Sequence, residues 1–405
     1  MFDFLKNKKK IIVFDIGAQK IGAISFRILN NKPIIADMEY QRNDISENIY
    51  SENTFNLSKI IKTIYEKITS EKEKKNLIYC NITDPRVLTR RNKSEIKSGK
   101  LGVSKKEIRK IFKKCILESK ITGKQLIHSY PLNFLIDEKT ITDQPLNEKC
   151  EKLGISCFNL LVDQKAFKNL NSSFKNNKLF VKNYFDSGIA SSNAFIGKEE
   201  KENGVINIDI GARTTKIVAY IDKRIAYVKN IQIAGDDVTS DISHGLQISK
   251  EAAEHAKIIH GTINLPFNEK IAIDLDSNEE KVINKNILYG IIKPRYDEIL
   301  EIVRDNVLDN IYTRVGIKSV VLTGGGSKIY GIKNLCESIF NRKTKIGQIE
   351  NSTSFFYCKP EFSTLLGMIN IVKNEKFLNS INTKTDNGYF SILEKLDNWI
   401  EESYA

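Results

Sequence analysis

Apolar and polar positions along the chain predict buried strands that alternate with helices. Two β-branched runs, Ile11–Ile16 and Val205–Ile210, each contain an Asp that stands two positions before a Gly, which gives an Asp-x-Gly motif. Each run is followed by a second apolar strand, at residues 21–29 and Thr215–Ile221. Because the same strand-and-turn unit occurs in both halves of the chain, we expect two related domains.

The residues that end these two runs suit phosphate and metal binding. Gly17 and Gly211 break each strand into a tight turn, where successive N–H groups can surround an anion. Asp15 and Asp209 precede the turns, and a carboxylate there can hold a hydrated cation. A plain acidic turn at the end of a strand is the structural alternative. The paired motif favours a nucleotide with Mg²⁺.

A third apolar run, Ser319–Thr323, leads into three consecutive glycines and then a helical pattern at Ile332–Phe340. The glycines are Gly324, Gly325 and Gly326. A simple strand-to-helix connection is one interpretation, but three glycines lose more conformational entropy than such a connection requires. We therefore expect a flat ring of a ligand to approach this backbone closely.

In this order, the three segments resemble the phosphate-1, phosphate-2 and adenosine motifs of the actin, Hsp70 and sugar-kinase superfamily. Residues 187–194, 233–242 and 251–261 are similar to further segments of one member family, the bacterial cell-division protein FtsA. The resemblance implies an α/β, actin-like fold with duplicated ribonuclease-H-type domains around a nucleotide cleft. It also implies that ATP and Mg²⁺ are bound by a set of residues in which Asp15 and Asp209 serve the metal. The set is Asp15, Gly17, Lys20, Asp209, Gly211, Thr214, Thr215, Lys216, Glu254, Lys257, Gly324, Gly325, Gly326 and Lys328.

Glu254 and Lys257 lie three positions apart on a predicted helix and therefore share one face. A carboxylate there can accept a hydrogen bond from a ribose hydroxyl, and an ammonium can contact the base or a phosphate. Spacing alone favours an ordinary surface ion pair. The resemblance to the family instead favours contact of this helix face with the nucleotide.

The sequence identifies no catalytic base beside a γ-phosphate. Ala18 and Gln19 stand where the superfamily usually has small hydroxyl residues, and Lys216 stands where many relatives have Asp. We therefore expect at most a slow ATPase, in which Lys20 and Lys216 strengthen nucleotide binding without assisting the chemistry.

Residues 76–180 predict an inserted α+β subdomain, with a helix at Lys105–Glu118, a strand pair at 126–137 and a strand at 153–162. A stabilising insertion is the alternative to an interaction module. The segment resembles subdomain 1C of the FtsA family. The resemblance then divides the chain into domain 1A (1–75 and 181–203), 1C (76–180), 2A (204–240 and 319–372), 2B (241–318), a linker (373–388) and a terminal helix (389–405).

The C-terminal segment 389–405 repeats apolar residues at helical spacing, and a polar linker precedes it. The protein's own core, a partner groove and a membrane interface are the three surfaces that could bury it. We expect the membrane, although acidic residues dominate the polar face and give no attraction to anionic lipid. The predicted membrane-facing residues are Phe390, Ile392, Leu393, Leu396, Trp399 and Ile400.

Composition narrows the remaining classes. The chain has 405 residues, of which 41% are hydrophobic, enough for packed domains. The formal net charge is +13, but the lysines are scattered, so we expect no nucleic-acid binding. Six cysteines without Cys-x-x-Cys spacing indicate reduced structural thiols in the cytoplasm. No secretory signal and no run long enough to span a bilayer are visible.

Together these patterns predict an FtsA-like adaptor on the cytoplasmic face of the inner membrane at the division septum. The resemblance implies self-association into filaments, binding of the C-terminal tail of FtsZ by domain 2B, and recruitment of later division proteins by 1C. Basic residues that could meet an acidic tail are Lys281, Lys285, Lys293, Arg295 and Arg304, and a solvated basic surface is the alternative. A soluble actin-fold kinase or ATPase and a pilus-assembly adaptor like PilM are the competing functions.

Overall fold

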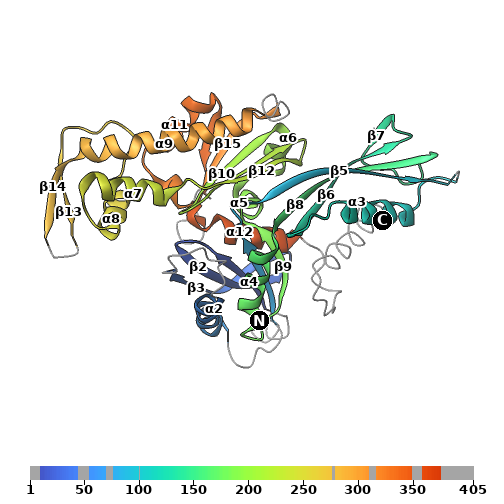
Figure 1. Cartoon of the computed structure of the whole chain (residues 1–405), viewed down its shortest axis with the longest axis horizontal. Helices are drawn as coiled ribbons and strands as arrows, with labels where there is room; N and C mark the ends of the chain where they lie inside the picture. Colours follow the sequence, from blue (N-terminus) through green and yellow to red (C-terminus); the bar gives the residue numbers. More distant parts are fainter. Residues whose placement is uncertain are drawn as a thin grey trace. The chain divides into compact units, whose positions relative to one another are not determined.

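The computed structural model describes residues 10–43, 54–69, 76–99, 101–275, 279–309, 316–348 and 358–374. The chain forms two compact units, whose elements are labelled in Figure 1. Unit 1 comprises the chain up to Ile16, Ile21–Asp186 and the chain from Ile371. Unit 2 comprises Gly17–Lys20 and Ser187–Asn370.

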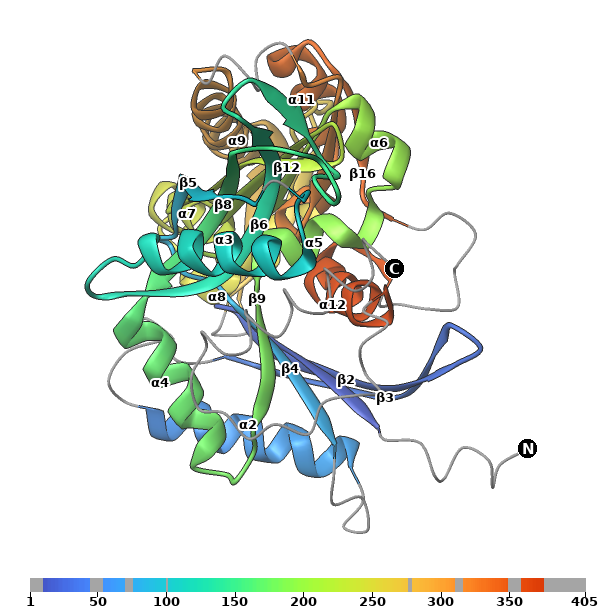
Figure 2. The ribbon, with the colours of Figure 1, turned by 90° about the vertical axis from the view of Figure 1, so that its right-hand side faces the viewer.

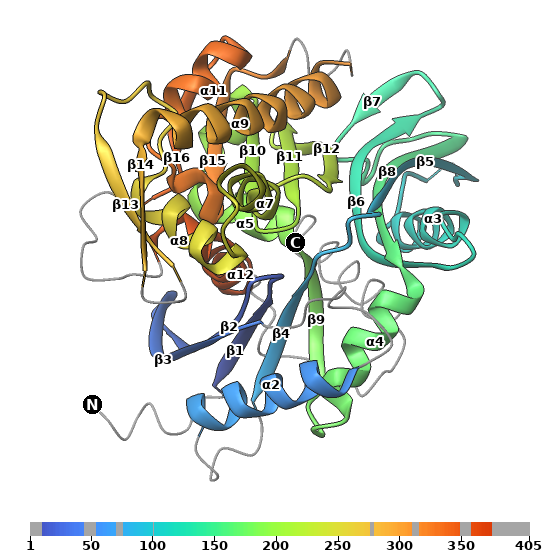
Figure 3. The same ribbon diagram turned by 60° about the vertical axis from the view of Figure 1, so that its left-hand side comes forward.

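Unit 1 is built on a five-stranded sheet in the order β3-β2-β1-β4-β9. Its strands are β1 (Ile11–Ile16), β2 (Lys20–Leu29), β3 (Lys32–Arg42), β4 (Leu77–Ile82) and β9 (Val181–Asp186). β1 pairs antiparallel with β2 and parallel with β4. Helices α2 (Thr54–Ile68) and α4 (Gln164–Lys175) pack against each other beside this sheet (Figure 3).

Unit 2 repeats this plan with a second sheet in the order β12-β11-β10-β15-β16. Its strands are β10 (Val205–Ile210), β11 (Thr215–Ile221), β12 (Arg224–Ile231), β15 (Ser319–Thr323) and β16 (Lys343–Ile346). β10 pairs antiparallel with β11 and parallel with β15, as β1 does with β2 and β4. The strand order and the directions of the pairs on either side of β1 and β10 thus match, so the predicted duplication is confirmed.

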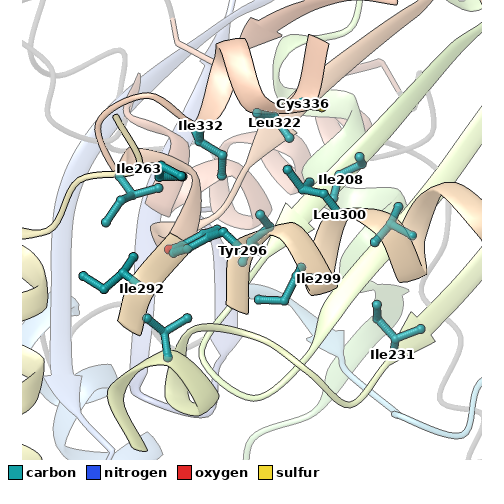
Figure 4. Packing of buried hydrophobic residues seen from close by; sticks show 14 of the residues in the cluster. Ile208, Ile231, Ile263, Ile292, Tyr296, Ile299, Leu300, Leu322, Ile332 and Cys336 are labelled. Carbon is teal, nitrogen blue, oxygen red and sulfur yellow. The ribbon is translucent and has the colours of Figure 1, made fainter. Parts of the chain in front are cut away.

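Helices and a hairpin complete unit 2. They are α5 (Ser187–Phe195), α6 (Lys198–Asn203), α7 (Gly235–Leu246), α8 (Lys250–His260), β13 (Lys270–Asp274), β14 (Glu280–Asn284), α9 (Lys285–Leu308), α11 (Ile332–Phe340) and α12 (Ser363–Asn374), which ends in unit 1. Figure 4 shows Tyr296, Ile299 and Leu300 of α9 in one buried cluster with Ile208 and Leu322 of the sheet. Burial on both sides explains why these strands are continuously apolar.

A separate four-stranded sheet in unit 1 has the order β5-β8-β6-β7. Its strands are β5 (Leu88–Lys97), β6 (Lys124–Ile136), β7 (Thr140–Thr142) and β8 (Lys152–Asp163). Helix α3 (Lys105–Glu118) packs on β5 and β8, at the predicted bounds (Figure 2). We refer to this sheet with α3 as the inserted module. The wider predicted limits, 76–180, stay a prediction.

The predicted strand pair at 126–137 is wrong, because β6 is one strand that continues through Pro131. Its pairing with β8 shifts register between Leu126 and His128 and again between Pro131 and Asn133. Proline has no N–H to donate to the ladder, so an irregularity at Pro131 keeps the strand intact. The helix at Lys105–Glu118 and the strand at 153–162 are confirmed.

All six cysteines are buried and free, in agreement with the predicted structural thiols. Among them, burial raises the pKa of Cys336 to about 12, which keeps its thiol protonated.

Candidate functional site

The two Asp-x-Gly turns have the same backbone geometry. The Gly17 N–H donates to the Lys20 carbonyl over 3.1 Å, and the Gly211 N–H donates to the Thr214 carbonyl over the same distance. A Cβ atom at Gly17 or Gly211 would lie 2.7 or 2.9 Å from that carbonyl oxygen. Both positions therefore require glycine, which explains why this part of the repeat is kept in the sequence.

A buried asparagine orients the first carboxylate. Asn81 of β4 donates through Nδ2 to Oδ1 of Asp15 over 2.6 Å, and its Oδ1 accepts the Ile16 N–H over 2.6 Å. The contact exists because β4 pairs with β1, which the sequence pattern did not predict. Its sequence signal is a polar residue within an otherwise apolar strand.

The second carboxylate, Asp209, stands opposite Lys216 on the neighbouring strand. Lys216 Nζ lies 3.5 Å from Asp209 Oδ2, and both residues are more than nine-tenths buried. Within the described residues, no three His, Cys, Asp or Glu side chains form a group that could hold a metal ion by themselves. One carboxylate fits Mg²⁺, which commonly keeps several waters and takes its remaining ligands from phosphates.

The three glycines have different environments. A Cβ atom at Gly324, where φ is +83°, would lie 2.4 Å from the Ile210 carbonyl oxygen, and one at Gly326 would lie 2.4 Å from Ile210 Cγ2. A Cβ atom at Gly325 would meet nothing within 4 Å. Packing against β10 therefore explains two of the three glycines. Of the three glycines, only Gly325 leaves room for a ligand, so the close approach expected at all three is kept for Gly325 alone.

The N-terminus of α7 supports the second turn. The Gly235 N–H donates to the Gly211 carbonyl over 3.1 Å, and the Asp236 N–H donates to the Ala212 carbonyl over 2.7 Å. The Arg213 guanidinium lies 3.4 Å from the Asp236 carboxylate. Burial raises the pKa of Asp236, and Arg213 only partly offsets this effect. The turn is thus fixed by backbone bonds to α7.

Glu254 and Lys257 of α8 form the ion pair that their spacing suggested, with 2.6 Å between Oε2 and Nζ. It is not an ordinary surface pair, since the two side chains are only 23% and 12% exposed. Lys257 also donates to the Gly235 carbonyl over 2.9 Å and to Oγ1 of Thr239 over 2.7 Å. The pair therefore ties α8 to the start of α7, directly behind the second turn.

Several charges and hydrogen bonds act on Glu254. Burial raises the pKa of Glu254, but the Lys257 ammonium and hydrogen bonds from Lys257, Thr239 and Gln19 outweigh burial and hold the pKa below its usual range. Glu254 is therefore ionised at neutral pH and can accept a hydrogen bond from a hydroxyl group.

Three other predicted site residues have partners inside unit 2. Thr215 donates its hydroxyl to the Ile233 carbonyl over 2.7 Å, and Lys328 pairs with Glu361 over 2.9 Å. Lys20 Nζ lies 3.8 Å from the ring centroid of Phe362. Thr215 thus serves the local structure.

The basic residues predicted to meet an acidic tail also have partners. Lys285 pairs with Glu269, Lys293 with Asp297, Arg295 with Asp241 and Glu298, and Arg304 with Asp305, while Lys281 donates to the Leu246 carbonyl. Their charges are largely balanced within unit 2. Charge alone therefore gives little support to these residues as a tail-binding surface.

The predicted membrane-facing residues from Phe390 to Ile400 lie outside the described part of the chain. Among the helices that are described, none has both the length and the apolar character needed to cross a membrane.

Comparison with known proteins finds similarity to one family. A family model described as "Cell division protein FtsA" matches residues 206–367. The chain is 26% identical to the cell division protein FtsA of Buchnera aphidicola subsp. Acyrthosiphon pisum, over 98% of this chain and 99% of the relative. It is 24% identical to the Escherichia coli K12 protein of the same name, over 69% of this chain and 70% of the relative.

Solved structures show which fold the chain shares. The PilM–PilN type IV pilus biogenesis complex contains a chain with a TM-score of 0.65 and 17% identity, matched over 90% of this chain and 98% of that chain. MreB5 of Spiroplasma citri bound to ADP has a TM-score of 0.55 and 14% identity, over 90% and 97% of the two chains. These similarities establish an actin-like fold, as the sequence motifs predicted.

Proposed function

We propose that the chain is a member of the FtsA family of cell-division proteins and an ATP-binding adaptor of the division machinery. The family model matched over residues 206–367, the similarity to FtsA relatives and the actin-like fold support this proposal. The protein acts on the cytoplasmic face of the inner membrane at the septum, where it assembles into filaments. Its role is attachment and recruitment, and any hydrolysis of ATP is slow.

The observation that carries nucleotide binding is the position of the second turn beside Asp209 and the open backbone at Gly325. β10 and β15 are parallel, so their carboxyl ends bring the Gly211–Thr214 turn and the glycine segment to one edge of the sheet. The turn would hold phosphates, and Asp209 would hold Mg²⁺ through water. Lys216 would offset phosphate charge. MreB5 of Spiroplasma citri, which has a related fold, was solved bound to ADP, and this supports the proposal of nucleotide binding.

The repeated first turn extends this role to the other half of the duplication. Asp15, Gly17 and Lys20 correspond by position in the repeat to Asp209, Gly211 and Thr214. Asn81 fixes the Asp15 carboxylate, so that group is pre-oriented before a ligand arrives. We assign the first turn to phosphate binding on this basis.

Attachment to the membrane would depend on the amphipathic segment 389–405. Its large apolar side chains supply the free energy of insertion, at about 1.5 to 3 kcal/mol for each fully buried group and less for partial insertion. Assembly of many copies would convert marginal single anchors into stable attachment.

The proposed partners are those that the resemblance to the FtsA family implies. The surface proposed for the FtsZ tail differs from the one expected from the sequence. The FtsZ tail would bind domain 2B, where apolar rather than charged residues offer contacts, since the cations there are paired. Large exposed apolar residues of this region are Ile258, Ile259, Leu265 and Phe267. Later division proteins would bind the inserted module.

A pilus-assembly adaptor is the second candidate, and the similarity in fold to the PilM–PilN complex favours it. The two functions differ in whether they require a membrane-binding tail. Co-sedimentation of the full chain and of a variant without residues 389–405, with liposomes, ATP and Mg²⁺, separates them. Binding that is lost on truncation supports the division adaptor. Equal sedimentation of both proteins, or none, refutes tail-mediated attachment and favours the PilM-like adaptor or a soluble actin-fold enzyme.

A further inference from the structure

Two buried cysteines lie in one hydrophobic cluster of the inserted module. Cys115 is on the face of α3 that packs on the module's sheet, and Cys157 is on the face of β8 that packs on α3 (Figure 2). Residues 153, 155 and 161 of β8 belong to the same cluster, as the period of two along a strand requires. Helix and strand thus bring together two thiols that are far apart in the sequence.

The register of the sheet places the two thiols next to each other. Asn92 of β5 stands directly opposite Cys157 in the pairing of β5 with β8. The Cys115 thiol donates to the Asn92 carbonyl, with 3.6 Å between sulfur and oxygen. The Cys157 thiol in turn forms a hydrogen bond with the Cys115 sulfur. The two sulfurs are therefore neighbours inside the module.

The surroundings of the two thiols make them unequal. The hydrogen bond from Cys157, together with one from Ser94, outweighs burial and holds the pKa of Cys115 below its usual range. Burial raises the pKa of Cys157, and the hydrogen bond with Cys115 raises it further. Cys115 therefore forms a thiolate more readily than Cys157, and the thiolate is the form that attacks an oxidant.

The other cysteines with shifted pKa values have different neighbours. Burial raises the pKa of Cys80, Cys150 and Cys336. Their hydrogen-bond partners are neighbouring carbonyl oxygens for Cys80 and hydroxyl groups for Cys150 and Cys336. A second thiol is not among these partners. The pair on α3 and β8 can therefore undergo a reaction for which these three thiols lack a neighbour.

We propose that Cys115 and Cys157 are a modification site, at which hydrogen peroxide forms a reversible disulfide. The Cys115 sulfur attacks the peroxide O–O bond, becomes a sulfenic acid, and the departing hydroxide takes a proton to give water. The Cys157 sulfur then attacks the Cys115 sulfur, the S–S bond forms, and the sulfenic oxygen leaves as a second water. The two thiols lose two electrons and two protons, which reduce one peroxide to two waters.

The disulfide would tie α3 covalently to β8. Thiols that share a hydrogen bond need side-chain rotation and a small shift of the helix, rather than refolding, to reach the S–S length of about 2.05 Å. Both side chains are fully buried, so peroxide reaches them during local opening of the module. This inference depends on neither nucleotide binding nor membrane attachment. It adds a redox-dependent crosslink to the module that we propose binds later division proteins.

The test exposes the full chain to hydrogen peroxide, alkylates the remaining thiols and maps tryptic peptides by mass spectrometry. Trypsin places Cys115, Cys150 and Cys157 in separate peptides, which are residues 115–120, 150–152 and 153–165. We expect peptides 115–120 and 153–165 to appear as a linked pair that is lighter than their sum by two hydrogens. The two thiols should be lost in equal amounts, and dithiothreitol should restore both.

Serine variants provide a second measurement. Cys115→Ser and Cys157→Ser should each abolish the linked pair of peptides. The matched control is Cys150→Ser, which removes another buried thiol of the same cluster and should form the linked pair like the parent protein. Oxidation should also raise the urea midpoint of unfolding in the parent and in the control, because the crosslink constrains the unfolded chain. This rise should be absent from the first two variants.

Three outcomes would overturn the inference. Sulfinic acid at Cys115 with Cys157 still reduced would show that the two sulfurs do not meet. A disulfide that links two chains, seen as a dimer on a non-reducing gel, would show that the reactive thiols lie on different molecules. The same mixture of pairings in folded and in urea-unfolded protein would show that the fold does not select this pair.

Discussion

Gly324 lies directly against Asp209. A Cβ atom at Gly324 would be 2.5 Å from Oδ1 of that carboxylate, although 115 positions separate the two residues in the sequence. Parallel pairing of β10 with β15 places Asp209 opposite Thr323, and the chain then turns at Gly324 with a φ of +83°. The glycine segment thus forms part of the wall beside the proposed metal-binding carboxylate.

Substitution Gly324→Ala should destabilise the protein by about 3 kcal/mol, because the methyl group meets backbone atoms and the positive φ is strained for alanine. Thermal or urea unfolding measures this loss. Gly325→Ala is the matched control, since a methyl group there meets no atom within 4 Å and stability should change by less than about 1 kcal/mol.

The same pair of variants tests the nucleotide assignment. If a flat base approaches the backbone at Gly325, Gly325→Ala lowers the affinity for ATP by about tenfold while stability is kept. Calorimetric titration gives the affinity. Unchanged affinity would show that the ligand does not approach this residue.

Substitution Lys257→Met should cost about 2 kcal/mol of unfolding free energy. It removes the ammonium from the Glu254 carboxylate, which keeps its hydrogen bonds from Thr239 and Gln19, and it leaves the Gly235 carbonyl without the Lys257 donor at a largely buried position. Lys250→Met, at an exposed position of the same helix, is the control and should be nearly neutral. Adding Glu254→Gln should recover part of the loss, and strict additivity would contradict a coupled network.

Substitution Lys216→Met should make the stability of the folded protein depend more strongly on Mg²⁺. Without Lys216, the Asp209 charge is buried with no cation beside it, which costs about 2 to 3 kcal/mol. Mg²⁺ with ATP should raise the unfolding temperature more in this variant than in the parent protein. Equal shifts in the two proteins would argue against a metal near Asp209.

The capping box of α3 predicts a dependence of stability on pH. Partial burial raises the pKa of Glu107, but hydrogen bonds from Ser104, Gly99 and Ser98 outweigh it and lower the pKa to about 2. Since the folded-state pKa is depressed from its ordinary value of 4.5, the stabilisation is complete above pH 4.5 and is lost as the pH falls toward 2.

Glu107→Gln should therefore cost about 1 kcal/mol at neutral pH and much less near about pH 3. Urea unfolding at the two pH values measures the difference, with Glu95→Gln, an exposed carboxylate on β5, as the control. A loss of the same size at both pH values would show that the Glu107 charge does not stabilise the cap.

Local signals made several elements predictable. The bounds of α3 coincide with Lys105–Glu118 because apolar residues at helical spacing and the Ser104 capping box act within a few neighbouring residues. The two Asp-x-Gly turns were predictable for the same reason, as each needs a glycine and a flanking strand. β6 was missed because Pro131 is a breaker in isolation, whereas pairing with β8 keeps the strand continuous.

The sequence by itself determined the duplication, the turn chemistry and the positions of most helices and strands, since these depend on residues that are close in the chain. Only the tertiary structure decided which side chains meet: Asn81 with Asp15, Gly324 with Asp209, and the carboxylates that balance the cations of domain 2B. It also showed that two of the three glycines serve packing. The physical reason is that parallel strand pairing and ion-pair partners depend on contacts between distant segments, which no local pattern encodes.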